Sequence, residues 1–171
     1  MSIADKGIPY VEVKKISDLL SIKQALSQPK DVREEMLGFP VETIVIDTID
    51  EVQNLVIAEL LAQEKKDKPA LQDWGKIAEE MKAIIRGFRN LDMHVVFTCH
   101  LKSVSDEETG RTWYMPGMAG QIAEKIPGMV DLSMVLRSAI VSNVTDKGVE
   151  KREVRLLESG ANRDYPFLYG S

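Results

Sequence analysis

The sequence predicts an α/β fold in which a mostly parallel sheet is flanked by helices and followed by a C-terminal antiparallel β meander. Two short apolar runs, 42–47 and 93–100, each end in a polar residue, as buried parallel strands do. The two longer segments between them repeat apolar residues every three or four positions, the period of amphipathic helices. Strands that alternate with helices require crossover connections, which place helices on both faces of the sheet.

Length and composition fit one domain, which we expect to span residues 1–171. Of the 171 residues, 44% are hydrophobic, enough for one sizeable core. The 22 Lys and Arg against 27 Asp and Glu give a net charge of −5, which provides no overall attraction to nucleic acid or to anionic membranes. Cys99 is the single cysteine, so an intramolecular disulfide is excluded. Without a secretory signal or a long apolar run, the sequence predicts a cytoplasmic protein that does not contact membranes.

The N-terminal part predicts a strand, a helix and then the first parallel strand. Ile8–Val13 alternates apolar and polar residues, as a strand does, so the chain is expected to open within the sheet. From Ser17, a capping residue and apolar residues at helical spacing indicate a helix that ends near Gln28, because the following proline disfavours helix. The run 42–47 is almost continuously apolar and β-branched, which favours a central strand buried on both faces.

Two further helices and a second parallel strand are expected next. The helices cover about Glu51–Gln63 and Leu71–Asn90, and Trp74 falls on the apolar stripe of the second, which places it in the core. Met93–His100 repeats the pattern of a buried strand. Ligands bind beyond the carboxyl ends of parallel strands, so the polar residues that end these strands are the first candidates for chemistry.

The C-terminal part is expected to be mostly β structure. Lys102–Thr112 predicts a polar loop, Trp113–Met115 a short strand and Gly117–Lys125 a helix. The expected strands of the meander are Val130–Leu136, Ala139–Val144 and Val149–Leu157. The last two are expected to be joined by a turn at Asp146–Gly148.

Asp47 ends the first parallel strand and is a candidate metal ligand. An aspartate that closes an apolar strand, here Thr43-Ile-Val-Ile-Asp47-Thr48, has the arrangement of a Walker B strand, in which a fixed carboxylate holds Mg²⁺. The same pattern also fits an acid that caps the following helix, with Thr48 and Asp50 as other cap candidates. The pattern alone leaves both interpretations open.

His100 ends the second parallel strand, where its imidazole could hydrogen-bond a phosphate or a nearby water. A lone histidine at a strand end also fits a purely structural role, and His94, at the start of the strand, is expected to have one. Cys99 is expected inside the strand, where a thiol is buried and unreactive. Two histidines and one cysteine placed in this way do not supply a zinc site.

The order of these elements resembles the RecA-like core of P-loop ATPases between Val41 and Arg163. The motifs that carry the resemblance are Thr-Ile-Val-Ile-Asp-Thr, Phe-Thr-Cys-His, Met-Pro-Gly-Met-Ala-Gly and Val-Asp-Leu-Ser-Met-Val-Leu-Arg. Within this fold, the sequence is most similar to phage nucleotide-binding proteins linked to single-strand annealing and recombination. The resemblance implies an enzyme that uses ATP and Mg²⁺, couples ATP hydrolysis to binding of single-stranded DNA, and assembles head-to-tail into homo-oligomers.

The resemblance also implies roles for residues at the strand ends and at the C-terminus. Asp47 corresponds to the Walker B magnesium ligand, Thr48 to a cofactor contact, and His100 to a sensor of nucleotide state. Arg163 resembles the terminal basic residue that reaches the nucleotide of a neighbouring subunit. Ala161 stands where a lysine is expected in that motif, which weakens the intersubunit role.

The expected DNA-binding segment is a mobile loop at Lys102–Met115. By the resemblance, Lys102, Arg111 and Trp113 contact single-stranded DNA, the arginine and lysine through phosphates and the tryptophan by stacking on bases. The acidic stretch 106–108 offsets both cations, so we expect the attraction of the isolated chain to phosphate to be weak.

The phosphate-binding loop of this family has no match in the sequence. It requires Gly-x-x-x-x-Gly-Lys-[Ser/Thr] between a strand and a helix, and the nearest segment, Gly110-Arg111-Thr112, has Ser105 where the first glycine should be. We therefore expect a RecA-like domain that is truncated at its N-terminus and lacks the first P-loop strand and the phosphate-binding loop, with negligible ATP hydrolysis by this chain alone. Two other classes stay open: a non-catalytic module that binds DNA or a partner, and an unrelated enzyme that uses Asp47 and His100 on a small phosphate ester.

Overall fold

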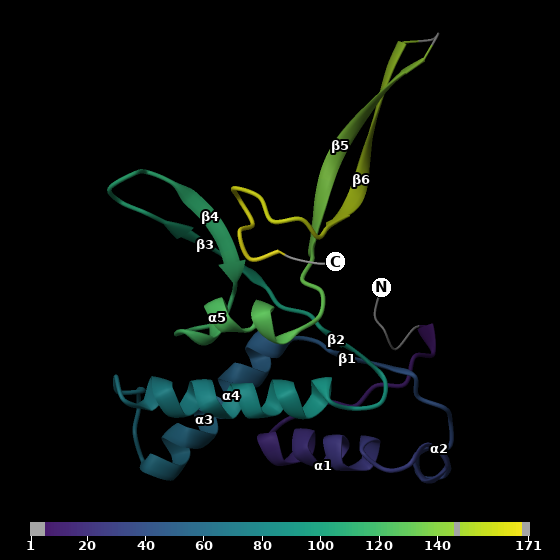
Figure 1. The fold of residues 1–171 in the computed structure, drawn as a ribbon, viewed down its shortest axis with the longest axis vertical. Coiled ribbons are helices and arrows are strands. Elements are labelled where there is room, and N and C mark those ends of the chain that lie inside the picture. The colour runs from purple at the N-terminus through teal and green to yellow at the C-terminus, as the bar shows by residue number, and fades with distance from the viewer. Residues whose placement is uncertain (1–5, 146–147, 169–171) are drawn as a thin grey trace. The chain divides into compact units, whose positions relative to one another are not determined.

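The protein is described by a computed structural model that covers residues 6–145 and 148–168. The chain divides into two compact units, residues 1–99 and 100–171, which are taken in turn (Figure 1). The first unit holds the long helices and a parallel strand pair, and the second holds two antiparallel hairpins with short helical turns. The chain is therefore α/β, as predicted.

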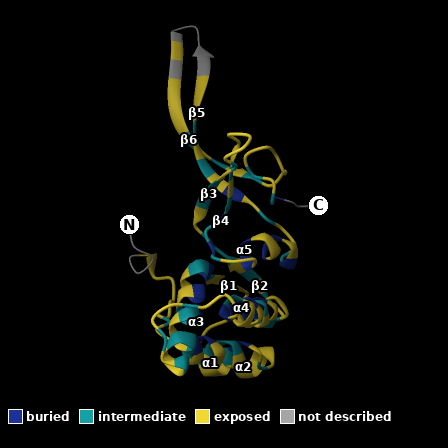
Figure 2. Ribbon diagram, turned by 90° about the vertical axis from the view of Figure 1, so that its left-hand side faces the viewer, coloured by how far each residue is buried: buried dark blue, intermediate teal, exposed yellow. Residues whose placement is uncertain are grey.

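Three helices form the apolar core of the first unit: α1 (Ile16–Leu26), α3 (Ile49–Glu64) and α4 (Asp73–Arg89). α3 packs against both α1 and α4. Their buried apolar residues, which are among those coloured dark blue in Figure 2, are Ile16, Leu19, Leu26, Ile49, Val52, Val56, Ile77, Ala78, Met81, Ile84, Ile85 and Phe88. The spacing of three and four residues predicts all three helices correctly, although Trp74 is half-buried rather than in the core.

A fourth helix, α2 (Lys30–Leu37), is absent from the sequence-based expectation. It begins directly after Pro29, because proline is tolerated at the start of a helix, where its missing N–H is not needed. Gly38 ends the helix in the left-handed conformation, with φ of 77°. Arg33 is buried and donates a hydrogen bond to the carbonyl oxygen of Leu26 at 3.1 Å, which ties α2 to the end of α1.

The parallel sheet of the first unit consists of β1 (Thr43–Ile46) and β2 (His94–Phe97), connected through α3 and α4. The parallel pairing is confirmed, but within the described residues the sheet has two strands, so a larger, mostly parallel sheet is not seen. The expected burial on both faces is wrong: Val45 is 59% exposed and Val96 45%.

The N-terminal strand expected at Ile8–Val13 is also wrong. This segment has no regular secondary structure, and Tyr10 and Val11 are exposed. Alternation of apolar residues gives a strand only where a neighbouring strand supplies hydrogen bonds, and β1 pairs with β2 alone in the described part of the chain.

The second unit begins with a hairpin of β3 (Leu101–Ser105) and β4 (Thr112–Pro116). β4 confirms the predicted strand around Trp113, whereas the expected polar loop Lys102–Thr112 is wrong over residues 102–105, which belong to β3, and at Thr112, which begins β4. The expected helix Gly117–Lys125 is reduced to α5 (Ile122–Lys125), followed by the short helical turn η2 (Pro127–Met129). Residues 101–116 therefore form a hairpin rather than one long loop.

The terminal meander is a two-stranded ribbon of β5 (Val135–Thr145) and β6 (Gly148–Glu158). The expected strand Ala139–Val144 lies within β5 and the expected strand Val149–Leu157 within β6. The expected strand Val130–Leu136 is wrong over residues 130–134, which precede β5 and form no strand. The expected turn residues 146–147 lie outside the described residues. At the start of the ribbon, the Arg137 guanidinium donates to Glu158 Oε1 at 2.8 Å and 2.5 Å and holds the pKa of that carboxyl below its ordinary value.

None of the helices in residues 6–145 and 148–168 combines the length and the apolar character that crossing a lipid bilayer requires.

A buried carboxylate holds the turn between α3 and α4. Asp73 is fully buried and accepts hydrogen bonds from Lys66 Nζ at 2.9 Å and 3.1 Å and from the backbone N–H of Ala70 at 2.7 Å. Glu64 joins the cluster through ion pairs with Lys66 and Lys76. The Lys66 ammonium, followed by the Ala70 N–H, lowers the pKa of Asp73, because both favour its charged form.

We predict that acid weakens the first unit through Asp73. Because its folded-state pKa lies below the unfolded value, its contribution to stability is complete above the unfolded pKa and is lost as pH falls through the folded pKa. Asp73→Asn should lower the urea midpoint at neutral pH, and the difference from wild type should shrink in strong acid. Asp67→Asn, which changes an exposed residue of the same turn, should leave the midpoint unchanged. A wild-type midpoint for Asp73→Asn at neutral pH would contradict this.

Candidate functional site

The strand ends of the first unit bring a carboxylate and a hydroxyl together. Asp47 follows β1 and Thr98 follows β2, and Thr98 Oγ1 donates to Asp47 Oδ1 at 2.5 Å. The Thr98 N–H donates to the Ile46 carbonyl at 3.0 Å, and its own carbonyl accepts from the Ile49 N–H at 2.9 Å. Thr98 is thus bonded on both sides of Asp47. Nothing in the sequence pattern singles out Thr98; only the register, in which Ile46 pairs with Phe97, aligns the two positions.

Thr48 precedes α3, and its conformation distinguishes between the two interpretations of Asp47, as a metal ligand or as the cap of the following helix. Its backbone is extended, with φ of −120° and ψ of 158°, and its Oγ1 accepts from the Glu51 N–H at 3.4 Å, so it is the N-cap. The carboxylate of Asp47 is therefore not used as the cap; it is exposed and bonded to Thr98. The Thr48 hydroxyl, for which the resemblance implies a cofactor contact, is engaged in this cap.

The donor set at this strand end suits Mg²⁺ that arrives with a phosphate. Mg²⁺ keeps several waters and is commonly held by one or two carboxylates together with substrate phosphates. Asp47 offers one exposed carboxylate whose position Thr98 fixes. In the described part of the chain, no group of three or more His, Cys, Asp or Glu side chains could hold a metal ion without further ligands. Asp47 would thus hold the ion only jointly with water and nucleotide.

His100 is exposed and lies immediately before β3, in the second unit, whereas Asp47 belongs to the first. The His100 carbonyl accepts a hydrogen bond from the Gly117 N–H at 2.6 Å, and a Cβ at Gly117 would lie 2.9 Å from that oxygen. Only glycine therefore allows this close approach. Cys99 lies just past β2 and is half-buried, which corrects the expectation of a buried cysteine inside the strand.

Lys102 of β3 is committed to a backbone contact. Its Nζ donates to the Met118 carbonyl at 2.5 Å, and the side chain is half-buried. This contact attaches the β3–β4 hairpin to the segment that follows β4. One of the three N–H donors of the ammonium is thus used within the chain, which fixes the position of the cation at the backbone of Met118.

Three residues with expected ligand roles lie together in the second unit, and we call them the arginine patch: Arg111, Trp113 and Arg163. The Arg111 guanidinium lies over the Trp113 ring, 5.6 Å from its centroid, where the ring quadrupole attracts the cation. It also donates to the Arg163 carbonyl at 3.2 Å. Both arginines are exposed and Trp113 is half-buried, so one cation lies over the aromatic ring and is bonded to the backbone of a second exposed arginine.

A tight turn, Asn162–Tyr165, presents the second arginine of the patch. Asn162 Oδ1 accepts hydrogen bonds from the N–H groups of Asp164 and Tyr165, each at 2.9 Å, as asparagine does in turns. Tyr114 of β4 donates its N–H to the Asp164 carbonyl at 2.8 Å. Its ring stacks on that of Tyr165 with centroids 5.4 Å apart. These contacts fix the turn to β4, so the position of the patch is set by the hairpin.

Negative charge at the tip of the β3–β4 hairpin opposes the arginine patch. Asp106 accepts hydrogen bonds from the Thr109 hydroxyl at 2.7 Å and the Glu108 N–H at 2.9 Å, and these lower its pKa, the hydroxyl most of all. Its N–H donates to the Arg111 carbonyl at 2.8 Å, so the carboxylate and the cation belong to one tight turn. The patch therefore attracts phosphate less than its two arginines alone would.

A known protein family matches nearly the whole chain. The model of an AAA domain matches residues 3–161. The chain is a member of this AAA-domain family. Its members are P-loop ATPases, so the predicted class, a nucleotide-binding P-loop NTPase, is confirmed, and such enzymes typically use ATP and Mg²⁺. No curated protein and no solved structure matches the chain.

The family match includes residues of both units. It covers Asp47 and Thr98 in the first unit and Arg111 and Trp113 in the second, and Arg163 lies just beyond its end. Asp47, Thr98 and two of the three residues of the arginine patch thus lie within the region that matches the AAA-domain family.

Proposed function

We propose that this AAA-family chain carries the magnesium-binding strand end of a RecA-like ATPase of phage origin that acts in DNA recombination. The hydrogen bond between Thr98 and Asp47 at the ends of two parallel strands is the observation that supports this most. It orients an exposed carboxylate where loops and a helix N-terminus converge, the usual place for a ligand in α/β sheets. Asp47 would hold Mg²⁺, which neutralises the charge of the nucleotide phosphates.

We also propose that this chain alone hydrolyses little ATP. Its sequence contains no Gly-x-x-x-x-Gly-Lys-[Ser/Thr], the motif whose backbone N–H groups and lysine hold the phosphates. Nucleotide affinity would then rest on a single carboxylate, and ATP hydrolysis by the isolated chain would be negligible. In the proposed head-to-tail assembly, in the cytoplasm of the host cell, His100 would report nucleotide state. Arg163, whose carbonyl is bonded to Arg111, would contact DNA and not the nucleotide of a neighbouring subunit.

The proposed magnesium site is tested with Mn²⁺ and ATP, because Mn²⁺ replaces Mg²⁺ and broadens the NMR signals of nearby nuclei. In the ¹⁵N-labelled chain, we predict selective broadening of the amide signals of residues 47–49 and 98. Asp47→Asn should abolish it, since a neutral amide binds the cation poorly. Asp92→Asn, a change at an exposed aspartate of the same unit, should not alter it.

One result would count against the proposed magnesium site, and another against the inactivity of the isolated chain. Broadening that survives Asp47→Asn would place the ion elsewhere. Robust Mg²⁺-dependent phosphate release that Asp47→Asn abolishes would confirm the site but refute the inactivity of the isolated chain.

We further propose that the arginine patch binds single-stranded DNA. Its support is the exposed Arg111 over the Trp113 ring and the exposed Arg163 whose backbone is bonded to Arg111, since cations meet phosphates and aromatic rings stack on bases. This reduces the expected role of Lys102, whose ammonium is bonded to a backbone carbonyl. The acidic hairpin tip keeps the affinity low, because its carboxylates repel phosphate.

Arg163→Ala tests this proposal. In fluorescence anisotropy with a labelled oligothymidylate, we predict roughly a three- to tenfold loss of affinity and a salt dependence reduced by about one phosphate contact. Arg86→Ala removes an exposed arginine from the first unit and should leave both values unchanged. Equal losses in the two variants would show that binding depends on overall charge and not on the arginine patch.

A second candidate function is a non-catalytic module that binds DNA or a partner protein. The sequence without a phosphate-binding loop and the exposed arginine patch both favour it. No Mn²⁺ broadening near Asp47, together with DNA binding that depends on Arg163, would select this function over the ATPase.

A further inference from the structure

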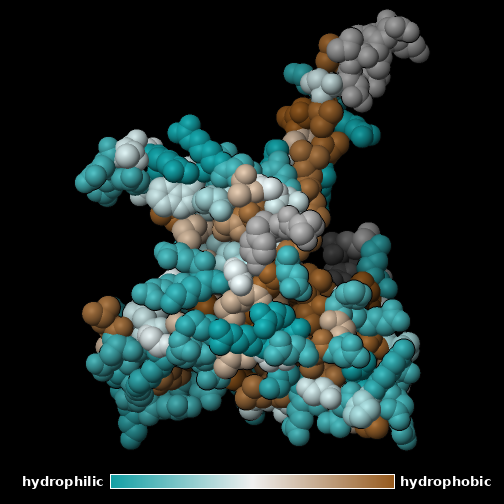
Figure 3. All heavy atoms as spheres, in the orientation of Figure 1, coloured by the Kyte–Doolittle hydropathy of each residue, from teal (hydrophilic) through white to brown (hydrophobic). Residues whose placement is uncertain are grey.

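The β5–β6 ribbon exposes a large amount of apolar surface. Leu136, Ile140, Val149 and Leu157 are 61–73% exposed, and Figure 3 shows apolar side chains gathered along the ribbon. In the described part of the chain, the ribbon has two strands, and isolated two-stranded ribbons are only marginally stable in water. Each strand also has one edge whose backbone groups are available for another strand.

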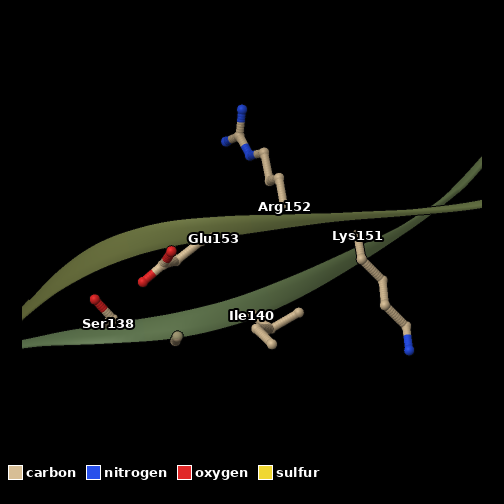
Figure 4. Close-up of a pocket in the computed structure, with 6 residues that line it drawn as sticks. Ser138, Ile140, Lys151, Arg152 and Glu153 are labelled. Atoms are coloured by element: carbon tan, nitrogen blue, oxygen red, sulfur yellow. The ribbon is translucent and has the colours of Figure 1, made fainter.

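The two edges of the ribbon differ in charge. β6 carries Lys151, Arg152 and Glu153 in succession, and Figure 4 shows Arg152 pointing to the opposite side of the ribbon from Lys151. Charged residues on an edge strand oppose pairing with other chains. On β5, the segment Ser138–Ser142 has no charged residue, proline or glycine, so the edge of β5 is the unprotected one.

The sequence of β5 is symmetric in polarity about Ile140. It reads Ser138-Ala-Ile-Val-Ser142, and the flanking pairs Arg137 with Asn143 and Leu136 with Val144 continue the symmetry. Two identical strands that pair antiparallel oppose each residue to its mirror position, so serine meets serine and alanine meets valine. Ile140 then faces Ile140 of the second copy. A register displaced by two residues would oppose Arg137 to Val141 and lose this match.

We propose that β5 pairs with β5 of a second copy of this chain, antiparallel and centred on Ile140, to form a four-stranded sheet. Each edge contributes backbone hydrogen bonds, as in other strand-addition interfaces. A strand segment without cations does not attract nucleic acid, whereas it matches an identical uncharged segment. The contact is two-fold, so it closes at two chains, unlike the head-to-tail assembly proposed above, and it does not depend on that assembly.

Single cysteines in a Cys99→Ser background test the register. Residues directly opposite in an antiparallel pair have Cβ atoms about 4.5–5.5 Å apart, near the distance that a disulfide spans. Mild oxidation should therefore convert Ile140→Cys to a covalent dimer. Ser138→Cys should crosslink to Ser142→Cys chains when the two are mixed, and neither should crosslink to itself. Leu157→Cys, exposed to a similar extent but on β6, should remain uncrosslinked.

Analytical ultracentrifugation tests the association itself. The wild-type chain should sediment as a dimer when its concentration is raised through the micromolar range. Ile140→Lys places two like charges opposite each other and should weaken the dimer at least tenfold, whereas Leu157→Lys should leave it intact. The proposal is overturned by a wild-type chain that stays monomeric, by a dimer that Ile140→Lys leaves unchanged, or by crosslinking of Leu157→Cys as efficient as that of Ile140→Cys.

Discussion

The bond between the Thr98 hydroxyl and the Asp47 carboxylate is the contact on which the candidate site depends. It forms because β1 and β2 run parallel and in register, so that the residues after Ile46 and Phe97 meet at one edge. Thr48 takes the cap of α3, which leaves the carboxylate available. A charged group held by one oriented donor and otherwise open to solvent is suited to a cation that brings its remaining ligands with it.

The second unit uses its polar side chains first to fix its own backbone. Lys102 bonds the Met118 carbonyl and Arg111 bonds the Arg163 carbonyl, while Gly117 allows close contact with the carbonyl of His100. Two side chains that were expected to contact a ligand are thus bonded within the chain. The position of the Arg111 guanidinium is consequently fixed by contacts within the chain, which would lower the entropy lost in the proposed binding of DNA.

The sequence predicts the helices α1, α3 and α4 and the strands β1 and β2 well, because the spacing of apolar residues reflects burial directly. It fails where structure depends on distant partners. Ile8–Val13 has the alternation of a strand but no neighbouring strand in the described residues, and β3 is polar yet pairs with β4. Thr98 escapes detection for the same reason, since its role follows from the register of two strands separated by two helices.

Thr98→Val tests most directly whether Thr98, acting on Asp47, creates the proposed magnesium site. Valine preserves the size of the side chain and removes the hydroxyl, whereas Thr98→Ser keeps the hydroxyl. Measured by Mn²⁺ broadening of the amide signals next to Asp47, the valine variant should lose most of the metal affinity and the serine variant should retain it. Wild-type affinity in Thr98→Val would show that Asp47 does not depend on this hydrogen bond and would contradict this proposal.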